Sequence, residues 1–167
     1  MKRYILATAL LANISGCTYD TFTEIEEPSF LISNFYSYRT LEETLSALDK
    51  RDSPYAVERG TEAGKGKGAP YKIDTIELDR YTLEGHEGRL VVSFFNDRLM
   101  SCVFFPQDYE SMLGMINTSI GLVRDSERMI SKHTRIRTYK DYRGEEYIAW
   151  EDSRLSDQHM RWISKYS

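Results

Sequence analysis

The chain has 167 residues, and 22 Lys and Arg against 26 Asp and Glu give it a formal net charge of −4. Apolar residues make up 41% and charged residues 29%, which is typical of one soluble globular domain. Twelve Tyr, seven Phe and two Trp are too many for a disordered chain. The acidic balance, with no Lys/Arg stripe, disfavours a nucleic-acid binder.

The N-terminus reads as an export signal. Residues 1–17 are MKRYILATALLANISGC, in which Lys2 and Arg3 precede a short apolar run. That run is about half of the ~20 residues that a membrane-spanning helix needs, so it predicts a processed signal rather than a permanent span. Its last four residues, Ile14-Ser15-Gly16-Cys17, resemble the lipobox of bacterial lipoproteins.

The resemblance implies cleavage before Cys17, a diacylglycerol on its thiol and an acyl chain on the new amine. The signal peptide is then 1–16, and several acyl chains hold a protein on a membrane far more stably than one. Thr18, in place of Asp, resembles the pattern that Gram-negative bacteria send to the outer membrane, so we expect a periplasm-facing anchor there. A Gram-positive source would leave the protein on the outer face of its only membrane. The alternative is an ordinary secretory signal with an incidental Cys17.

After the signal, an acidic stretch predicts a lipidated Cys and flexible tether over 17–28, followed by a single globular domain over 29–167. The eleven residues after Cys17 reach at most ~40 Å. Phe30–Tyr36 is an apolar segment whose secondary structure the sequence leaves open. Thr40-Leu41-Glu42-Glu43 matches a capping box and predicts a helix over 41–50.

The stretch Gly60–Pro70 (GTEAGKGKGAP) invites comparison with a phosphate-binding loop. The match fails because the spacing is one residue short, Gly66 replaces the required Ser or Thr, and Pro70 prevents a helix from following. A surface loop is expected.

Five strands are expected along the chain, four of them in two hairpins. The first pairs 89–95 with 99–105, after an imperfect strand over 71–81 and a turn over 85–88. A three-residue loop at 96–98 would place Phe94 opposite Met100, Val92 opposite Cys102 and Leu90 opposite Phe104, giving one wholly apolar face. The second hairpin pairs 134–140 with 146–150.

Asp108 caps a helix with Tyr109, Met112, Leu113, Ile116 and Ile120 on one face, and the tail over 156–166 is a helix or a last strand. These elements predict an α+β fold: an antiparallel sheet of about four to five strands with one or two helices packed on one face.

No catalytic template fits the sequence, so we expect no enzyme, no metal site and no cofactor. His86-Glu87 begins like a zinc-protease motif but Leu90 stands where the second His belongs. His86, His133 and His159 are far apart in the sequence, and most of them are expected to be exposed at the surface. Glu151-Asp152 beside Trp150 suggests a sugar site, although adjacent side chains on a strand point to opposite faces. Cys102, in an apolar strand, is expected to be a buried thiol rather than a nucleophile.

Tyrosine is enriched at contact surfaces, and the tyrosines exceed what a small core takes. Those considered for an exposed patch are Tyr36, Tyr38, Tyr81, Tyr109, Tyr139, Tyr142, Tyr147 and Tyr166. We therefore expect a membrane-anchored adaptor or accessory protein that binds another envelope protein. The alternatives are a small-ligand or glycan binder, which needs an exposed Trp150 or Trp162, and an inhibitor or immunity protein against a periplasmic toxin.

Overall fold

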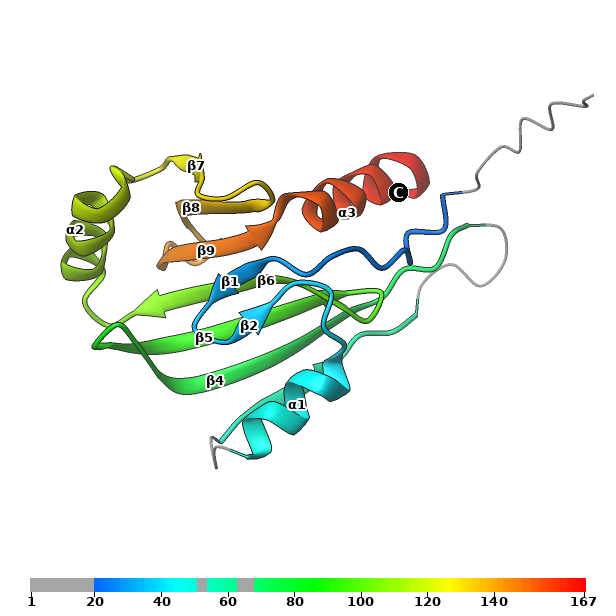
Figure 1. Cartoon of the computed structure of the whole chain (residues 1–167), viewed down its shortest axis with the longest axis horizontal. Coiled ribbons are helices and arrows are strands. Elements are labelled where there is room, and N and C mark those ends of the chain that lie inside the picture. The colour runs from blue at the N-terminus through cyan, green and yellow to red at the C-terminus, as the bar shows by residue number, and fades with distance from the viewer. Residues whose placement is uncertain (1–19, 51–53, 63–67) are drawn as a thin grey trace, which may run out of the picture.

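A computed structural model describes residues 20–50, 54–62 and 68–167. The expected signal peptide, Cys17 and residues 63–67 of the Gly60–Pro70 stretch lie outside these residues. In the described part the chain forms three helices, a seven-stranded antiparallel sheet and a two-stranded sheet (Figure 1). The α+β class is confirmed, but the sheet has more strands than the four to five expected.

The large sheet has the order β3-β4-β5-β6-β9-β8-β7. Its strands are β3 (Ala56–Arg59), β4 (Ile73–Leu83), β5 (His86–Phe95), β6 (Arg98–Pro106), β7 (Glu127–Met129), β8 (Thr134–Lys140) and β9 (Glu146–Asp152). It therefore consists of two meanders that meet where β9 pairs with β6, with Cys102 opposite Trp150. The strands missing from the sequence prediction, β3 and β7, are short, exposed edge strands without an alternating apolar pattern.

The two faces of the sheet carry separate apolar clusters. On one face, Phe94 and its neighbours pack against the β1–β2 hairpin (Phe30–Ile32 and Phe35–Tyr36), α1 (Leu41–Asp49) and α2 (Tyr109–Ile120). On the other face, Phe95 packs with Trp162 of α3 (Ser153–Tyr166). Neighbouring residues of a strand point to opposite faces, so the expectation that helices cover one face only was wrong.

Local signals placed the helices. Thr40 and Glu43 form the expected capping box, with Thr40 Oγ1 accepting from the Glu43 amide at 3.1 Å. Asp108 caps α2 by accepting from the Ser111 amide at 3.0 Å. The C-terminal tail is helical, and Asp152 caps it.

The β5–β6 hairpin differs from the prediction at its tip. The loop has two residues, Asn96 and Asp97, both at positive φ (49° and 58°), as a type I′ turn requires. Phe94 therefore faces Leu99 rather than Met100. A bulge at Met100 then restores the expected pairs, Val92 with Cys102 and Leu90 with Phe104, so the apolar face is kept. The β4–β5 turn is likewise tighter than expected, since β5 already begins at His86.

Residues 20–29, which we call the strap, lie along the domain rather than free of it. Phe22 is 1% exposed, within the cluster formed by Phe95 and Trp162. Much of the segment expected to be a flexible tether is thus held against the sheet (Figure 1). Among the described residues, none of the helices combines the length and the apolar character needed to cross a membrane.

Candidate functional site

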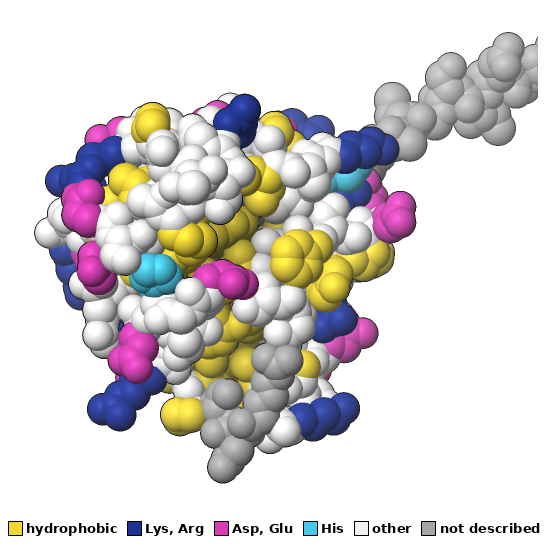
Figure 2. Space-filling view, turned by 60° about the vertical axis from the view of Figure 1, so that its left-hand side comes forward, with side chains coloured by type: hydrophobic (Ala, Val, Ile, Leu, Met, Phe, Trp, Pro, Cys, Tyr) yellow, Lys and Arg dark blue, Asp and Glu magenta, His cyan; other side chains and the backbone are white. Residues whose placement is uncertain are grey.

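An apolar groove lies at the end of the molecule that carries α2. It has a volume of about 230 Å³ and is bounded by α2, the β1–β2 hairpin and the sheet. Its lining residues are Phe30, Leu31, Ile32, Ser33, Leu83, Glu84, Met112, Met115, Ile116, Ser119, Ile120, Ile130, Ile136 and Trp150. Figure 2, which brings this end forward, shows hydrophobic side chains gathered along a hollow in the surface.

The groove exists because α2 covers the sheet incompletely. Met112 and Ile116 are buried against the core, while Met115 and Ile120, on the flank of the same helix, are only partly covered. The helix ends at Gly121, which adopts the left-handed conformation (φ 68°) that favours glycine. The carbonyl of Ile120 accepts a hydrogen bond from Arg128 of β7, which fixes that end of the helix.

Large apolar side chains continue from the groove onto the surface. Phe30 is 51% exposed and Ile130 is 40% exposed, and both line the groove. Trp150, 7% exposed, also lines it. Glu84 is the single charged residue among those that line the groove, so this surface offers apolar contact and little hydrogen bonding. The two methionines add an unbranched lining that adapts to different shapes.

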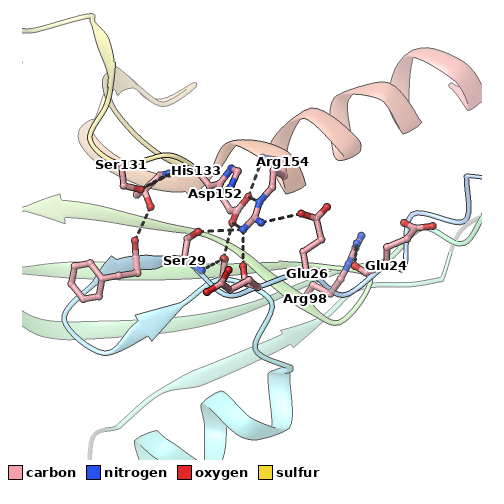
Figure 3. A network of polar contacts seen from close by, with 12 residues as sticks. Glu24, Glu26, Ser29, Arg98, Ser131, His133, Asp152 and Arg154 are labelled. Carbon is pink, nitrogen blue, oxygen red and sulfur yellow. Dashed lines mark hydrogen bonds and ion pairs between the residues drawn. The ribbon is translucent and has the colours of Figure 1, made fainter.

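A network of polar contacts holds the strap where it approaches the groove (Figure 3). The fully buried Asp152 accepts hydrogen bonds from Ser37 Oγ at 2.7 Å and from Arg154 Nη2 at 2.6 Å. Arg154 also donates to the Glu27 carbonyl at 2.9 Å and to Glu26 Oε2 at 3.0 Å. One carboxylate at the β9–α3 junction thereby joins the sheet, the strap and the β1–β2 hairpin.

A second arginine holds the other end of the strap. Arg98 is 1% exposed, and its guanidinium donates to the carbonyls of Phe22 and Glu24, the latter at 2.8 Å. It also donates to Gln158 Oε1 of α3 at 2.9 Å. Asn96, in the β5–β6 turn, adds a hydrogen bond to the Phe22 carbonyl at 2.9 Å.

The electrostatics follow from this burial. Desolvation lowers the pKa of the Arg98 guanidinium. The hydrogen bond to Asp152 raises the pKa of Arg154, so its guanidinium stays charged. The pKa of Tyr38 is raised to about 12, mainly by burial and to a smaller extent by the negative charge of Asp152. These are structural groups, and none of them lines the groove.

The residues suggested for a sugar site are placed differently from what such a site needs. Glu151 is buried and pairs with Arg135, whose Nε lies 2.7 Å from Glu151 Oε1. Asp152 points to the other face and caps α3. The two carboxylates are thus engaged in separate structural contacts. Trp162 is mostly buried, and its indole N–H donates to the Ala69 carbonyl at 3.0 Å.

Cys102 is fully buried, as expected, and burial raises the pKa of its thiol. The three histidines are half-buried rather than fully exposed, unlike the exposure expected for most of them. His159 lies against the Phe95 ring and its Nε2 is 2.9 Å from the Tyr71 hydroxyl. In the described part of the chain, no group of three or more His, Cys, Asp or Glu is arranged to hold a metal ion.

The tyrosines considered for an exposed patch differ widely in their exposure. Tyr38 and Tyr109 are buried, and only Tyr139 and Tyr142 of the eight considered are exposed. The groove was not predicted from the sequence. The spacing of Met112, Ile116 and Ile120 did mark an apolar helix face, but spacing alone cannot show which part of a face remains uncovered.

The chain was also compared with known proteins. No protein-family model matches it, and no curated protein matches it in sequence.

Proposed function

We propose that this protein is a membrane-anchored lipoprotein of the bacterial envelope that acts as a non-enzymatic adaptor. Its groove binds an apolar segment of another envelope protein. The observation that carries the proposal is the groove itself, with Phe30 and Ile130 exposed along it and Trp150 within it. Contiguous exposed apolar surface is unfavourable in water, at roughly 25 cal/mol per Å², and in soluble proteins it marks interaction sites.

The shape of the groove favours a protein segment over a small molecule. A typical small-molecule pocket encloses about 70–90% of its ligand and places a few polar groups around it. This groove is an open hollow on the surface with one charged lining residue, Glu84 (Figure 2). A partner that inserts large apolar side chains and covers Phe30 from outside would bury the whole surface.

A small apolar ligand is the second candidate, because Trp150 lines a hollow of about 230 Å³. A ligand seated there would contact the indole ring and change its fluorescence. Extraction of the purified protein with organic solvent, followed by mass spectrometry, would detect a bound lipid. The apolar lining makes a glycan a poorer match than a lipid.

The anchor is tested at Cys17. We expect the mature protein to carry acyl chains on Cys17 and to remain with the membrane fraction after high-salt washing. The Cys17→Ala variant should be unacylated and leave that fraction. Mass spectrometry of the mature N-terminus reports the modification directly. Acylation of the Cys17→Ala variant, or a mature wild-type chain without any acyl chain, would contradict the anchor.

The groove is tested with a photo-crosslinking amino acid placed at Phe30 in otherwise wild-type cells. The matched control is Tyr142, which is 87% exposed on the β8–β9 turn and outside the groove. We expect a discrete crosslinked product from position 30 that is absent from position 142 and lost when Met115→Glu adds a charge to the groove. Equal products from both positions, or a product that survives Met115→Glu in a folded protein, would refute the groove as the binding surface.

A further inference from the structure

The strap determines how the domain is placed on the membrane. Its first part is fixed by packing as well as hydrogen bonds: the Phe22 ring lies 6.4 Å from the Phe95 ring and 6.3 Å from the Tyr166 ring. Asp20, the first described residue, lies 3.6 Å from Arg161 of α3. The chain therefore meets the domain at residue 20, beside the last turns of α3.

This contact leaves a short reach to the lipid. Only three residue steps separate Cys17 from Asp20, and they span at most ~10 Å. The same chain would reach ~40 Å if all of the residues up to 28 were free. The end of the domain that carries the last turns of α3 must then lie next to the lipid headgroups. Arg161 and Lys165 are exposed there, and cations at a bilayer surface are attracted to anionic lipids.

Helix α2, which bounds the groove, lies at the opposite end of the molecule from the last turns of α3 (Figure 1). Strand β5 connects the two ends: His86 follows the groove residue Glu84 closely, and Phe95 contacts the strap residue Phe22. Ten residues of extended strand cover about 30 Å. The strap runs in the opposite direction to β5, from Phe22 beside Phe95 towards β1, where Phe30 lines the groove.

We infer that the strap fixes the orientation of the domain, with the last turns of α3 against the bilayer and the groove about 30 Å away from it and facing outward. The partner segment is therefore one that stands clear of the bilayer, such as an apolar segment of a periplasmic domain, and not a membrane-embedded helix. This inference rests on the proposed function, because it uses the lipid on Cys17 and the groove as the binding surface.

The test measures energy transfer from the acylated protein to an acceptor-labelled lipid. The acylated protein is reconstituted into vesicles of phosphatidylethanolamine and phosphatidylglycerol that contain the acceptor. A donor dye is attached to Ser164→Cys on the last turns of α3 or to Ser119→Cys beside the groove; both positions are exposed, and buried Cys102 does not compete for the dye. We expect severalfold stronger transfer from position 164 than from position 119.

Two further variants separate the strap from the lipid. An insertion of about twelve Gly and Ser residues before Asp20 keeps every strap contact but lengthens the tether, and should bring the two transfer values together. Arg98→Met combined with Arg154→Met removes both arginine anchors of the strap and should do the same. Equal transfer from positions 164 and 119 in the acylated parent protein would overturn the fixed orientation alone. Absence of acyl chains, seen by mass spectrometry before reconstitution, would instead defeat the proposed anchor and this inference with it.

Discussion

Replacing Arg98 by methionine tests whether the strap is part of the folded domain. Methionine keeps much of the apolar stem but removes four hydrogen bonds, to the carbonyls of Phe22, Glu24 and Phe95 and to Gln158 Oε1. The Phe22 carbonyl still has its partner Asn96, and Glu24 is exposed, so its carbonyl can bind water. The group left buried and unpaired is the Gln158 side chain.

The magnitude follows from these contacts. An orphaned buried acceptor costs about 1–3 kcal/mol, and a hydrogen bond to a charged donor contributes about 1.5–3 kcal/mol. Part of this loss is offset, because the variant no longer desolvates a guanidinium. We expect the free energy of unfolding to fall by about 3 kcal/mol, and proteolytic cleavage within 20–29 to become faster.

The assay is urea unfolding of the unlipidated Cys17→Ser protein, together with limited proteolysis. Arg143→Met is the control, because Arg143 is exposed on the β8–β9 turn; such a change should alter stability by less than about 0.5 kcal/mol. If Arg98→Met and Arg143→Met unfold at the same urea concentration and are cleaved alike, the strap is not part of the cooperative fold.

Three other predictions concern stability and reactivity. Gly88→Ala should lower the free energy of unfolding by about 1–3 kcal/mol or more, because an added Cβ would lie 2.3 Å from the Phe105 carbonyl oxygen. Gly114→Ala, in open space on α2, should raise the free energy of unfolding by up to about 1 kcal/mol; urea midpoints check both. Cys102 should resist a thiol reagent until urea unfolds the protein, and rapid labelling of the native Cys17→Ser protein would disprove its burial. Burial lowers the pKa of His159 below its ordinary value of 6.5, so the stability that its neutral form contributes is complete above pH 6.5 and is lost as the pH falls through the folded pKa. As the pH is lowered from above 6.5, the melting temperature should fall more steeply for the wild type than for His159→Phe. Equal slopes of melting temperature against pH would contradict this prediction.

Much of the fold was predictable because its signals are local. The capping box at Thr40 and the N-cap at Asp108 placed two helices within a residue or so, since a cap needs only its neighbouring amides. The apolar alternation around Cys102 predicted a central, buried strand. The sequence prediction made the turn one residue too long, because a bulge at Met100 compensates for a shorter turn. A bulge cannot be recognised from the pattern of apolar residues.

The candidate site was largely invisible in the sequence. Phe30 and Ile130 are 100 residues apart and line one groove only after the sheet is assembled. Arg98 looked like an ordinary polar turn residue, yet it is buried because the strap and α3 close over it. Composition pointed to tyrosine as the contact residue. Burial, however, depends on which faces of the sheet and helices are covered, and Tyr38 and Tyr109 are buried in the core.

The sequence by itself determined the starts of α1 and α2, the central strands and the burial of Cys102, because these depend on the period of apolar residues and on capping within a few positions. It left the C-terminal tail open as a helix or a strand. It also carries the resemblance to a lipobox at Cys17, from which the anchor is proposed. Only the tertiary structure decided that residues 20–29 lie on the domain and that an apolar groove stays open beside α2. Both depend on contacts between segments far apart in the chain, such as Arg98 with the Phe22 carbonyl and Thr134 with the Phe30 carbonyl, which no local pattern encodes.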